Sequence, residues 1–234
     1  MERILITGAN RGIGYEFVRQ YLQRDNTRLF AACRTPDTAT GLQQLAAQHP
    51  DRLTVVQMDV IDKDSIIAAE KTVAAQVDGL DLLINNAAIN PSGQQGFATI
   101  SQETMLNVLN VNVVGPLLVT QVFVDLLKAG NNPRLVNISS QMGSLERRDN
   151  GGPYAYCSSK AALNMVTRSL AADLKIHDII SVMTHPGWVR TDMGGSGAPL
   201  STEESTQGLI QLFDRLTMKD NSQFYQWDGE SLPW

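Results

Sequence analysis

A glycine-rich turn near the start of the chain lies between a strand pattern and a helix pattern. Residues 4–6 are apolar and short enough for a buried strand, and residues 15–22 read as a helix. The turn between them contains Gly8, Gly12 and Gly14. Glycine lets a backbone approach a pyrophosphate, and the helix N-terminus supplies free N–H groups. The spacing departs from Gly-x-Gly-x-x-Gly, and an ordinary turn is the alternative, but the strand–turn–helix context favours dinucleotide binding.

Strand and helix patterns alternate along the rest of the sequence. Strands are predicted at residues 28–33, 53–57, 80–84, 134–138, 179–183 and 223–227, and helices at 40–49, 62–77, 102–127 and 156–175. This alternation is typical of a Rossmann-type, doubly wound α/β fold, with about seven parallel strands and helices on both faces. A chain of 234 residues with 43% hydrophobic content suits one domain spanning 1–234. Ligands of such sheets bind beyond the carboxyl ends of the strands.

The end of the second predicted strand indicates which dinucleotide is bound. An NAD site would place a carboxylate here to hold the ribose 2′-hydroxyl. This chain has Arg34 instead, and Arg11 lies in the glycine turn. Two guanidinium groups can hold a 2′-phosphate with charge-assisted hydrogen bonds. The pattern predicts NADP(H), and two solvated surface arginines are the alternative.

A tyrosine and a lysine four residues apart open the predicted helix at residues 156–175. Tyr156 and Lys160 lie on the same helical face, one turn apart. A free tyrosine has a pKa of about 10, and a neighbouring cation lowers that value by stabilising the phenolate. The pair is therefore interpreted as a tuned general acid, although the spacing alone also occurs by chance.

Two further features suggest polar groups near this pair. Pro116 has no N–H, so the Asn112 carbonyl loses its helical partner, the helix kinks, and an ordered water could bind there. The alternative is a bend in a core helix. The serines at 139 and 140 close a predicted strand, where a hydroxyl could donate to a substrate carbonyl or simply cap a turn.

Composition argues against several other classes of protein. A net charge of −5 disfavours nucleic acid or anionic lipid as a partner. Two cysteines are too few for a disulfide framework, and the three histidines lack metal-ligand spacing, so no metal is expected. We find no apolar run near 18 residues and no room for a leader before the first strand. We therefore expect a cytoplasmic protein without a membrane span.

Taken in order, these motifs resemble the short-chain dehydrogenase/reductase family over nearly the whole chain. The matching pieces are residues 7–14, Asp59, residues 85–88, Asn112, residues 138–140, Tyr156 with Lys160, and residues 186–191. Residues 151–156, 185–195 and 229–234 are similar to a narrower branch of C-factor-like proteins and sniffer-type carbonyl reductases. That branch holds enzymes and proteins discussed mainly as signals, so the resemblance leaves the substrate open.

The resemblance implies a role for each residue of the catalytic set. Tyr156 would give a proton to the carbonyl oxygen, while Lys160 would lower the Tyr156 pKa and hold the nicotinamide ribose. Ser140 would orient the carbonyl, and Asn112 would hold a water that connects Lys160 to solvent. The expected cofactor contacts are Gly8, Asn10, Arg11, Gly12, Ile13, Gly14, Arg34, Asp59, Val60, Asn86, Ala87, Ala88, Tyr156, Lys160, Pro186, Gly187, Val189 and Thr191.

Two segments are expected to border the substrate. Residues 194–197 are glycine-rich, and Ser201 with Glu204 fits a capping box that begins a new helix. A lid near residues 190–210 is the functional interpretation, and an ordinary surface loop is the alternative. The polar residues 145–150 lengthen the spacing between Ser140 and Tyr156 beyond that of many family members, and a loop at the pocket rim is expected there.

The sequence thus predicts an NADPH-dependent oxidoreductase that moves hydride between nicotinamide and a small carbonyl or alcohol substrate. Tyr156 would be its general acid and base. The alternative is a nucleotide-binding signalling or regulatory protein of the C-factor type, with incidental turnover. The family resemblance also implies a homodimer or homotetramer.

Overall fold

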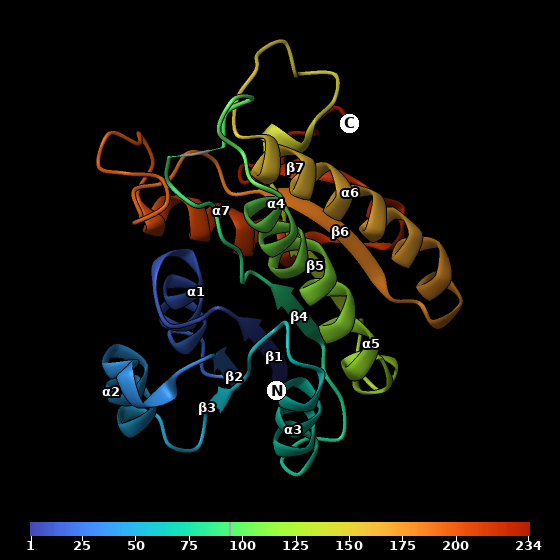
Figure 1. Cartoon of the computed structure of the whole chain (residues 1–234). Coiled ribbons are helices and arrows are strands. Elements are labelled where there is room, and N and C mark those ends of the chain that lie inside the picture. The colour runs from blue at the N-terminus through green and yellow to red at the C-terminus, as the bar shows by residue number, and fades with distance from the viewer. Residues whose placement is uncertain (94) are drawn as a thin grey trace.

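The computed structural model describes residues 1–93 and 95–234, and the strands of this part form one seven-stranded sheet (Figure 1). The strands are β1 (Glu2–Thr7), β2 (Thr27–Cys33), β3 (Leu53–Gln57), β4 (Leu82–Asn85), β5 (Arg134–Ile138), β6 (Ile180–His185) and β7 (Phe224–Gln226). Their order is β3-β2-β1-β4-β5-β6-β7, and all neighbours are parallel. The predicted doubly wound α/β fold is therefore confirmed.

The order of the strands reverses between β1 and β4. From β1 the chain adds β2 and β3 on one side, then crosses back and adds β4 to β7 on the other. The connections after β1 and β4 therefore leave the sheet toward opposite faces, which opens a crevice at the carboxyl ends of these strands. The predicted ligand-binding motifs follow these strand ends.

Helices cover both faces of the sheet (Figure 1). They are α1 (Gly12–Leu22), α2 (Thr40–Gln48), α3 (Lys63–Ala74), α4 (Gln102–Leu109), α5 (Gly115–Lys128), α6 (Tyr154–Leu174) and α7 (Thr202–Arg215). One buried cluster joins the sheet to α1, α2 and α7, and a second joins its other face to α3, α5 and α6. Strand β1 contributes to both, because Ile4 and Ile6 point into the first cluster and Leu5 into the second.

The predicted helix over residues 102–127 is interrupted in its middle. A π-helical turn, Asn110–Val114, joins α4 to α5, and the Gly115 N–H donates to the Asn110 carbonyl five residues back. Pro116 supplies the physical reason, because its ring has no N–H and clashes with the carbonyl four residues earlier in an α-helix. The predicted distortion at Asn112 is confirmed, and it takes the form of a widened turn.

The helical run Gln102–Lys128 is long and apolar enough to cross a membrane by length and composition alone, with a mean hydropathy of 1.5. The expectation that no such run exists is wrong by that criterion. The core helices of α/β proteins pass the same test, so the finding is weak evidence for a membrane. In this fold Val119, Phe123 and Leu127 are fully buried in the core, which accounts for the apolar composition.

Candidate active site

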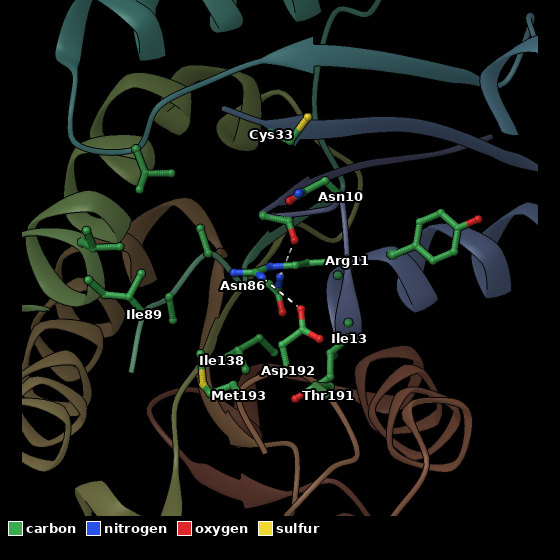
Figure 2. A pocket seen from close by; sticks show the side chains of 18 of the residues that line it. Asn10, Arg11, Ile13, Cys33, Asn86, Ile89, Ile138, Thr191, Asp192 and Met193 are labelled. Atoms are coloured by element: carbon green, nitrogen blue, oxygen red, sulfur yellow. Dashed lines mark hydrogen bonds and ion pairs between the residues drawn. The ribbon is translucent and has the colours of Figure 1, made fainter. Parts of the chain in front are cut away.

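A cleft of about 1010 Å³ lies at the switch point, beyond the carboxyl ends of β1 and β4 (Figure 2). Many of the predicted site residues line it, namely Gly8, Asn10, Arg11, Gly12, Ile13, Gly14, Arg34, Asp59, Val60, Asn86, Ala87, Ala88, Tyr156, Lys160, Pro186 and Thr191. Asn112, Ser140, Gly187 and Val189 lie outside its lining. The fold therefore brings the glycine turn, the Arg34 strand end and the Tyr156 helix to one cavity.

Some lining residues were not singled out from the sequence. Ile89 and Val111 are two of them, and Figure 2 labels Ile89 among the side chains of the cleft. Each is apolar and carries no chemical signal of its own. Their only signal is position, because each lies within two residues of a predicted site residue.

The glycines after β1 are required by close packing. Gly8 and Gly12 have φ angles of 64° and 56°, in the left-handed region. A Cβ at Gly14 would lie 2.3 Å from the Gly8 carbonyl oxygen, so a larger residue would push α1 away from the turn. Among the described residues no side chain caps the start of α1, whose first turn also lacks an acidic residue. Its N–H groups are therefore available to an anion.

Hydrogen bonds tie the end of β4 to the glycine turn. The Thr7 hydroxyl accepts from the Asn86 and Ala87 N–H groups, both at 3.0 Å. In return, Asn86 Nδ2 donates to the carbonyls of Thr7 at 2.9 Å and Gly8 at 3.1 Å. The Asn86 amide nitrogen thus supports the turn.

The two arginines expected at the 2′-phosphate have different surroundings. Figure 2 shows Arg11 and Asp192 pointing toward one another, and the Arg11 Nη1 to Asp192 Oδ2 distance is 3.0 Å. Both side chains are more than two-thirds exposed, at 71% and 79%. Arg34 is also exposed, and within the described residues it has no hydrogen bond or ion pair. Arg34 is thus free to bind an anion, whereas Arg11 already has a carboxylate partner.

Tyr156 and Lys160 lie one turn apart on α6 and are both buried. The Lys160 Nζ is 5.7 Å from the centre of the Tyr156 ring. Its hydrogen bond goes to the Ile138 carbonyl at the end of β5, at 2.8 Å. The predicted proximity of the pair is confirmed, but the amine is held by the strand end rather than by the phenol.

Burial dominates the acid–base properties of this pair. It raises the pKa of Tyr156 to about 12, and the Ser140 hydroxyl acts in the opposite direction. It also lowers the pKa of Lys160 to about 7. The expectation that Lys160 lowers the Tyr156 pKa is therefore wrong in this structure. Loss of water around the buried phenol dominates its pKa, and Lys160 is not among the groups that shift it.

The two serines after β5 have distinct partners. The Ser139 hydroxyl donates to Asn164 Oδ1 at 2.6 Å, inside the fold. The Ser140 hydroxyl oxygen accepts from the Met142 N–H at 3.1 Å and caps the short 3₁₀ turn Gln141–Gly143. The capping role that the sequence left open is thus observed. The Ser140 hydroxyl can still donate its own proton to another group.

Asn112 acts as a clamp between two segments of the chain. Its side-chain oxygen accepts from the Ile89 N–H at 2.8 Å, and its Nδ2 donates to the Ile89 carbonyl at 2.9 Å. The same Nδ2 donates to the Ser159 hydroxyl at 3.0 Å. Because the amide is engaged in this way, the expected water would have to bind at the Asn112 main-chain carbonyl.

The segment expected to form a lid is folded back on itself. Val189 and Leu200 form a parallel bridge, and the Arg190 guanidinium donates to the Pro199 carbonyl at 2.6 Å. Val189 is buried and does not line the cleft, whereas Thr191 and Met193 do. The predicted capping box of Ser201 and Glu204 is present at the start of α7.

The polar loop at residues 145–150 packs against the end of the chain. The Glu146 N–H and the Ser144 hydroxyl donate to the Trp234 carbonyl, at 2.8 and 3.0 Å. The Arg168 guanidinium lies 4.7 Å from the centre of the Trp234 ring. None of residues 145–150 lines the cleft, so the expected rim loop stands outside the cavity described above.

Comparison with known proteins supports the same interpretation of the fold. Residues 2–199 match the family model described as short chain dehydrogenase. The C-signal of Myxococcus xanthus is 38% identical over 156 residues, covering 66% of this chain and 93% of that protein.

Two solved structures share the architecture throughout. The NADPH-bound carbonyl reductase from chicken fatty liver has a TM-score of 0.95 and 37% identity, covering 100% of this chain and 99% of its own. The carbonyl reductase Sniffer of D. melanogaster has a TM-score of 0.94 and 35% identity, and both chains are covered in full.

Proposed function

The chain belongs to the short-chain dehydrogenase family, and we propose that it is an NADP(H)-dependent reductase of small carbonyl compounds. One observation carries this proposal: the glycine turn, Arg34, Tyr156 and Lys160 all line a single cleft. The glycine turn and Arg34 suit an anionic dinucleotide, and the other two residues suit proton transfer. A protein that only bound nucleotides would have no use for that second pair.

The residues of the cleft fit NADP(H). The glycines leave room for a pyrophosphate at the start of α1, where a Cβ at Gly8 would lie 2.8 Å from the Ala87 Cα. Arg34, which has no partner among the described residues, would hold the 2′-phosphate. The chicken and Pseudomonas aeruginosa carbonyl reductases, described as bound to NADPH and NADP, support this choice. The chemistry that the cofactor contributes when bound is hydride transfer.

Tyr156 is suited to give a proton to the substrate oxygen. With a pKa of about 12 it is protonated throughout the neutral range, so it is a donor rather than a base. The Ser140 hydroxyl lies close enough to affect the Tyr156 pKa and would donate to the same oxygen. These properties suit both hydroxyl groups to donate hydrogen bonds to a carbonyl oxygen at neutral pH.

Lys160 is suited to resupply the proton. Its pKa of about 7 lets the amine exchange a proton near neutral pH. The Ile138 carbonyl holds Nζ, which lies 5.7 Å from the centre of the Tyr156 ring, and Asn112 lies in the π-helical turn between α4 and α5. We assign Lys160 and the Asn112 carbonyl to a path for protons between solvent and the phenol.

The direct test is NADPH oxidation with a panel of aldehydes, ketones and quinones. The wild-type protein should turn over at least one of them, and Tyr156→Phe should lower kcat by about 10²-fold or more, since it removes general acid catalysis. NADPH binding, followed by cofactor fluorescence, should stay nearly intact, because most of the expected cofactor contacts remain. Retained turnover in Tyr156→Phe would refute the role of the phenol.

A second candidate function is a nucleotide-binding signalling or regulatory protein with incidental turnover. The similarity to the C-signal of Myxococcus xanthus favours it. The same panel separates the two, because this candidate predicts NADPH binding without turnover of any carbonyl.

We also retain a homodimer or homotetramer as a proposal. Leu106 on α4 and Met165 on α6 are large apolar side chains that are 57% and 66% exposed. Sedimentation of the purified protein would decide this point.

A further inference from the structure

The helix that carries Tyr156 begins without a capping side chain of its own. Pro153 precedes the first turn of α6 and has no hydroxyl, carboxylate or amide to offer. The first N–H groups of a helix have no partner inside the helix, so each needs an acceptor from elsewhere. Tyr156 occupies the third position of α6 and is 8% exposed. Leaving its N–H unpaired would therefore be costly.

Gln95, from the loop after β4, supplies the missing acceptors. Its side-chain Oε1 accepts from the Tyr156 N–H at 3.1 Å, and its main-chain carbonyl accepts from the Tyr154 N–H at 3.0 Å. Gln95 is 4% exposed, although 61 positions separate it from Tyr156 in the sequence. A glutamine from a distant loop thus caps the helix that carries the proton donor.

The orientation of the Gln95 amide is determined by its other contacts. Its Nε2 donates to Asn90 Oδ1 at 2.8 Å and to the Pro91 carbonyl. The Pro91 carbonyl can only accept and the Tyr156 N–H can only donate, so a reversed Gln95 amide would oppose both of these partners. The oxygen of Gln95 is therefore committed to Tyr156.

The Tyr156 backbone is held on its other side as well. The Ser159 hydroxyl donates to the Tyr156 carbonyl at 2.7 Å and accepts from Asn112, which clamps Ile89. The loop that starts at Ile89 is thus attached to the Tyr156 turn both through Asn112 and through Gln95. Contacts at both ends of this loop converge on the peptide groups that position the phenol.

We infer that Gln95 is a positioning residue for Tyr156, an inference that rests on the proposed reductase function. Its side chain holds the first turn of α6 so that the phenol meets the substrate oxygen. Without the acceptor this turn would fray, and a displacement of about 1 Å can lower a rate by roughly 10²-fold. The loss should appear in kcat, because Gln95 does not line the cofactor cleft.

The test compares two substitutions of Gln95 in the full-length protein. Gln95→Met removes the acceptor and keeps the length, whereas Gln95→Glu keeps an oxygen facing the Tyr156 N–H but, as a carboxylate, cannot donate to Asn90 or Pro91. Ser92→Ala is the matched control, because Ser92 is exposed in the same loop and has no hydrogen bond with the described residues. For each protein we would measure kcat, KM for the carbonyl, NADPH affinity and amide hydrogen exchange at Tyr156.

Gln95→Met should lower kcat about tenfold or more and leave NADPH affinity within about twofold. Gln95→Glu should retain at least about a third of kcat, and Ser92→Ala all of it. Exchange of the Tyr156 amide should accelerate by about tenfold in Gln95→Met alone. This readout does not depend on turnover.

Three results would overturn the inference: unchanged kcat in Gln95→Met, equal losses in both Gln95 variants, or unchanged exchange at Tyr156. A parallel fall in kcat and NADPH affinity would also count against it, because it would indicate general loss of structure. A wild-type protein that turned over no carbonyl would refute the proposed function instead. The exchange measurement would then still decide whether Gln95 holds Tyr156.

Discussion

Lys160→Met should raise the free energy of unfolding at pH 6 and have a smaller effect at pH 9. Lys160 is 2% exposed, and burial lowers its pKa from 10.5 to about 7. Between these two values the unfolded chain holds a proton on this lysine that the folded chain has lost. Methionine is similar in length and uncharged, so it removes this titration and leaves the other groups in place.

The size and the sign of the effect of Lys160 on the free energy of unfolding follow from its pKa values in the folded and unfolded chain. Below pH 7 the lysine is charged in both states, and burying that charge opposes folding by roughly 5 kcal/mol. The unfavourable contribution shrinks as the pH rises toward 10.5, so wild-type stability should recover by between about 2 and 3 kcal/mol from pH 6 to pH 9. Loss of the hydrogen bond to the Ile138 carbonyl should lower the free energy of unfolding of Lys160→Met by about 1–3 kcal/mol at every pH.

Urea unfolding followed by tryptophan fluorescence measures this difference. Wild type, Lys160→Met and the exposed control Lys71→Met would be compared from pH 6 to pH 9. The advantage of Lys160→Met over wild type should narrow with rising pH, while Lys71→Met should follow the wild type throughout. A gap of constant size would refute the reasoning, because it would mean that Lys160 does not lose its proton in this range. Turnover should be lost in Lys160→Met, so greater stability would accompany lower activity.

Two further predictions concern the cofactor. Arg34→Asp should raise KM for NADPH by about tenfold or more and shift preference toward NADH, since it replaces a charge-assisted contact with repulsion; an unchanged ratio of kcat/KM for the two cofactors would contradict it. Asp192→Asn should release Arg11 and lower KM for NADPH by up to about fivefold, because an exposed ion pair contributes at most about 1 kcal/mol. The gain should fade in high salt, and a salt-independent effect would count against the ion pair as its cause.

Much of the fold could be predicted because its signals are local. The strand bounds at residues 53–57 and 134–138 were predicted without error. Both strands are short runs rich in β-branched and other apolar residues between turn residues, a pattern that can be recognised in the sequence. The distortion at Asn112 was predicted from Pro116 because a missing N–H acts on the carbonyl four residues away. The π-helical form of this distortion was not predicted, because the local geometry that a helix adopts at such a point depends on the side chains packed around it.

The site shows the same division. The shared helical face of Tyr156 and Lys160 could be read from a spacing of four residues. The direction of the Tyr156 pKa could not, because burial by distant segments outweighs a neighbouring amine. Arg11 and Arg34 look equivalent in the sequence. The fold distinguishes them, because it places Asp192, which is 181 residues away in the sequence, beside Arg11.

The sequence by itself determined the parallel α/β architecture, the glycine turn and the face that carries the proton-transfer pair. Each of these depends on backbone periodicity or on turn chemistry within a few residues. Only the tertiary structure decided how strongly that pair is desolvated and that Gln95 caps the Tyr156 helix. Both features arise only when segments far apart in the sequence pack together: packing excludes water from the pair, and it brings the Gln95 oxygen to the Tyr156 N–H. Neither produces a periodic pattern in the sequence.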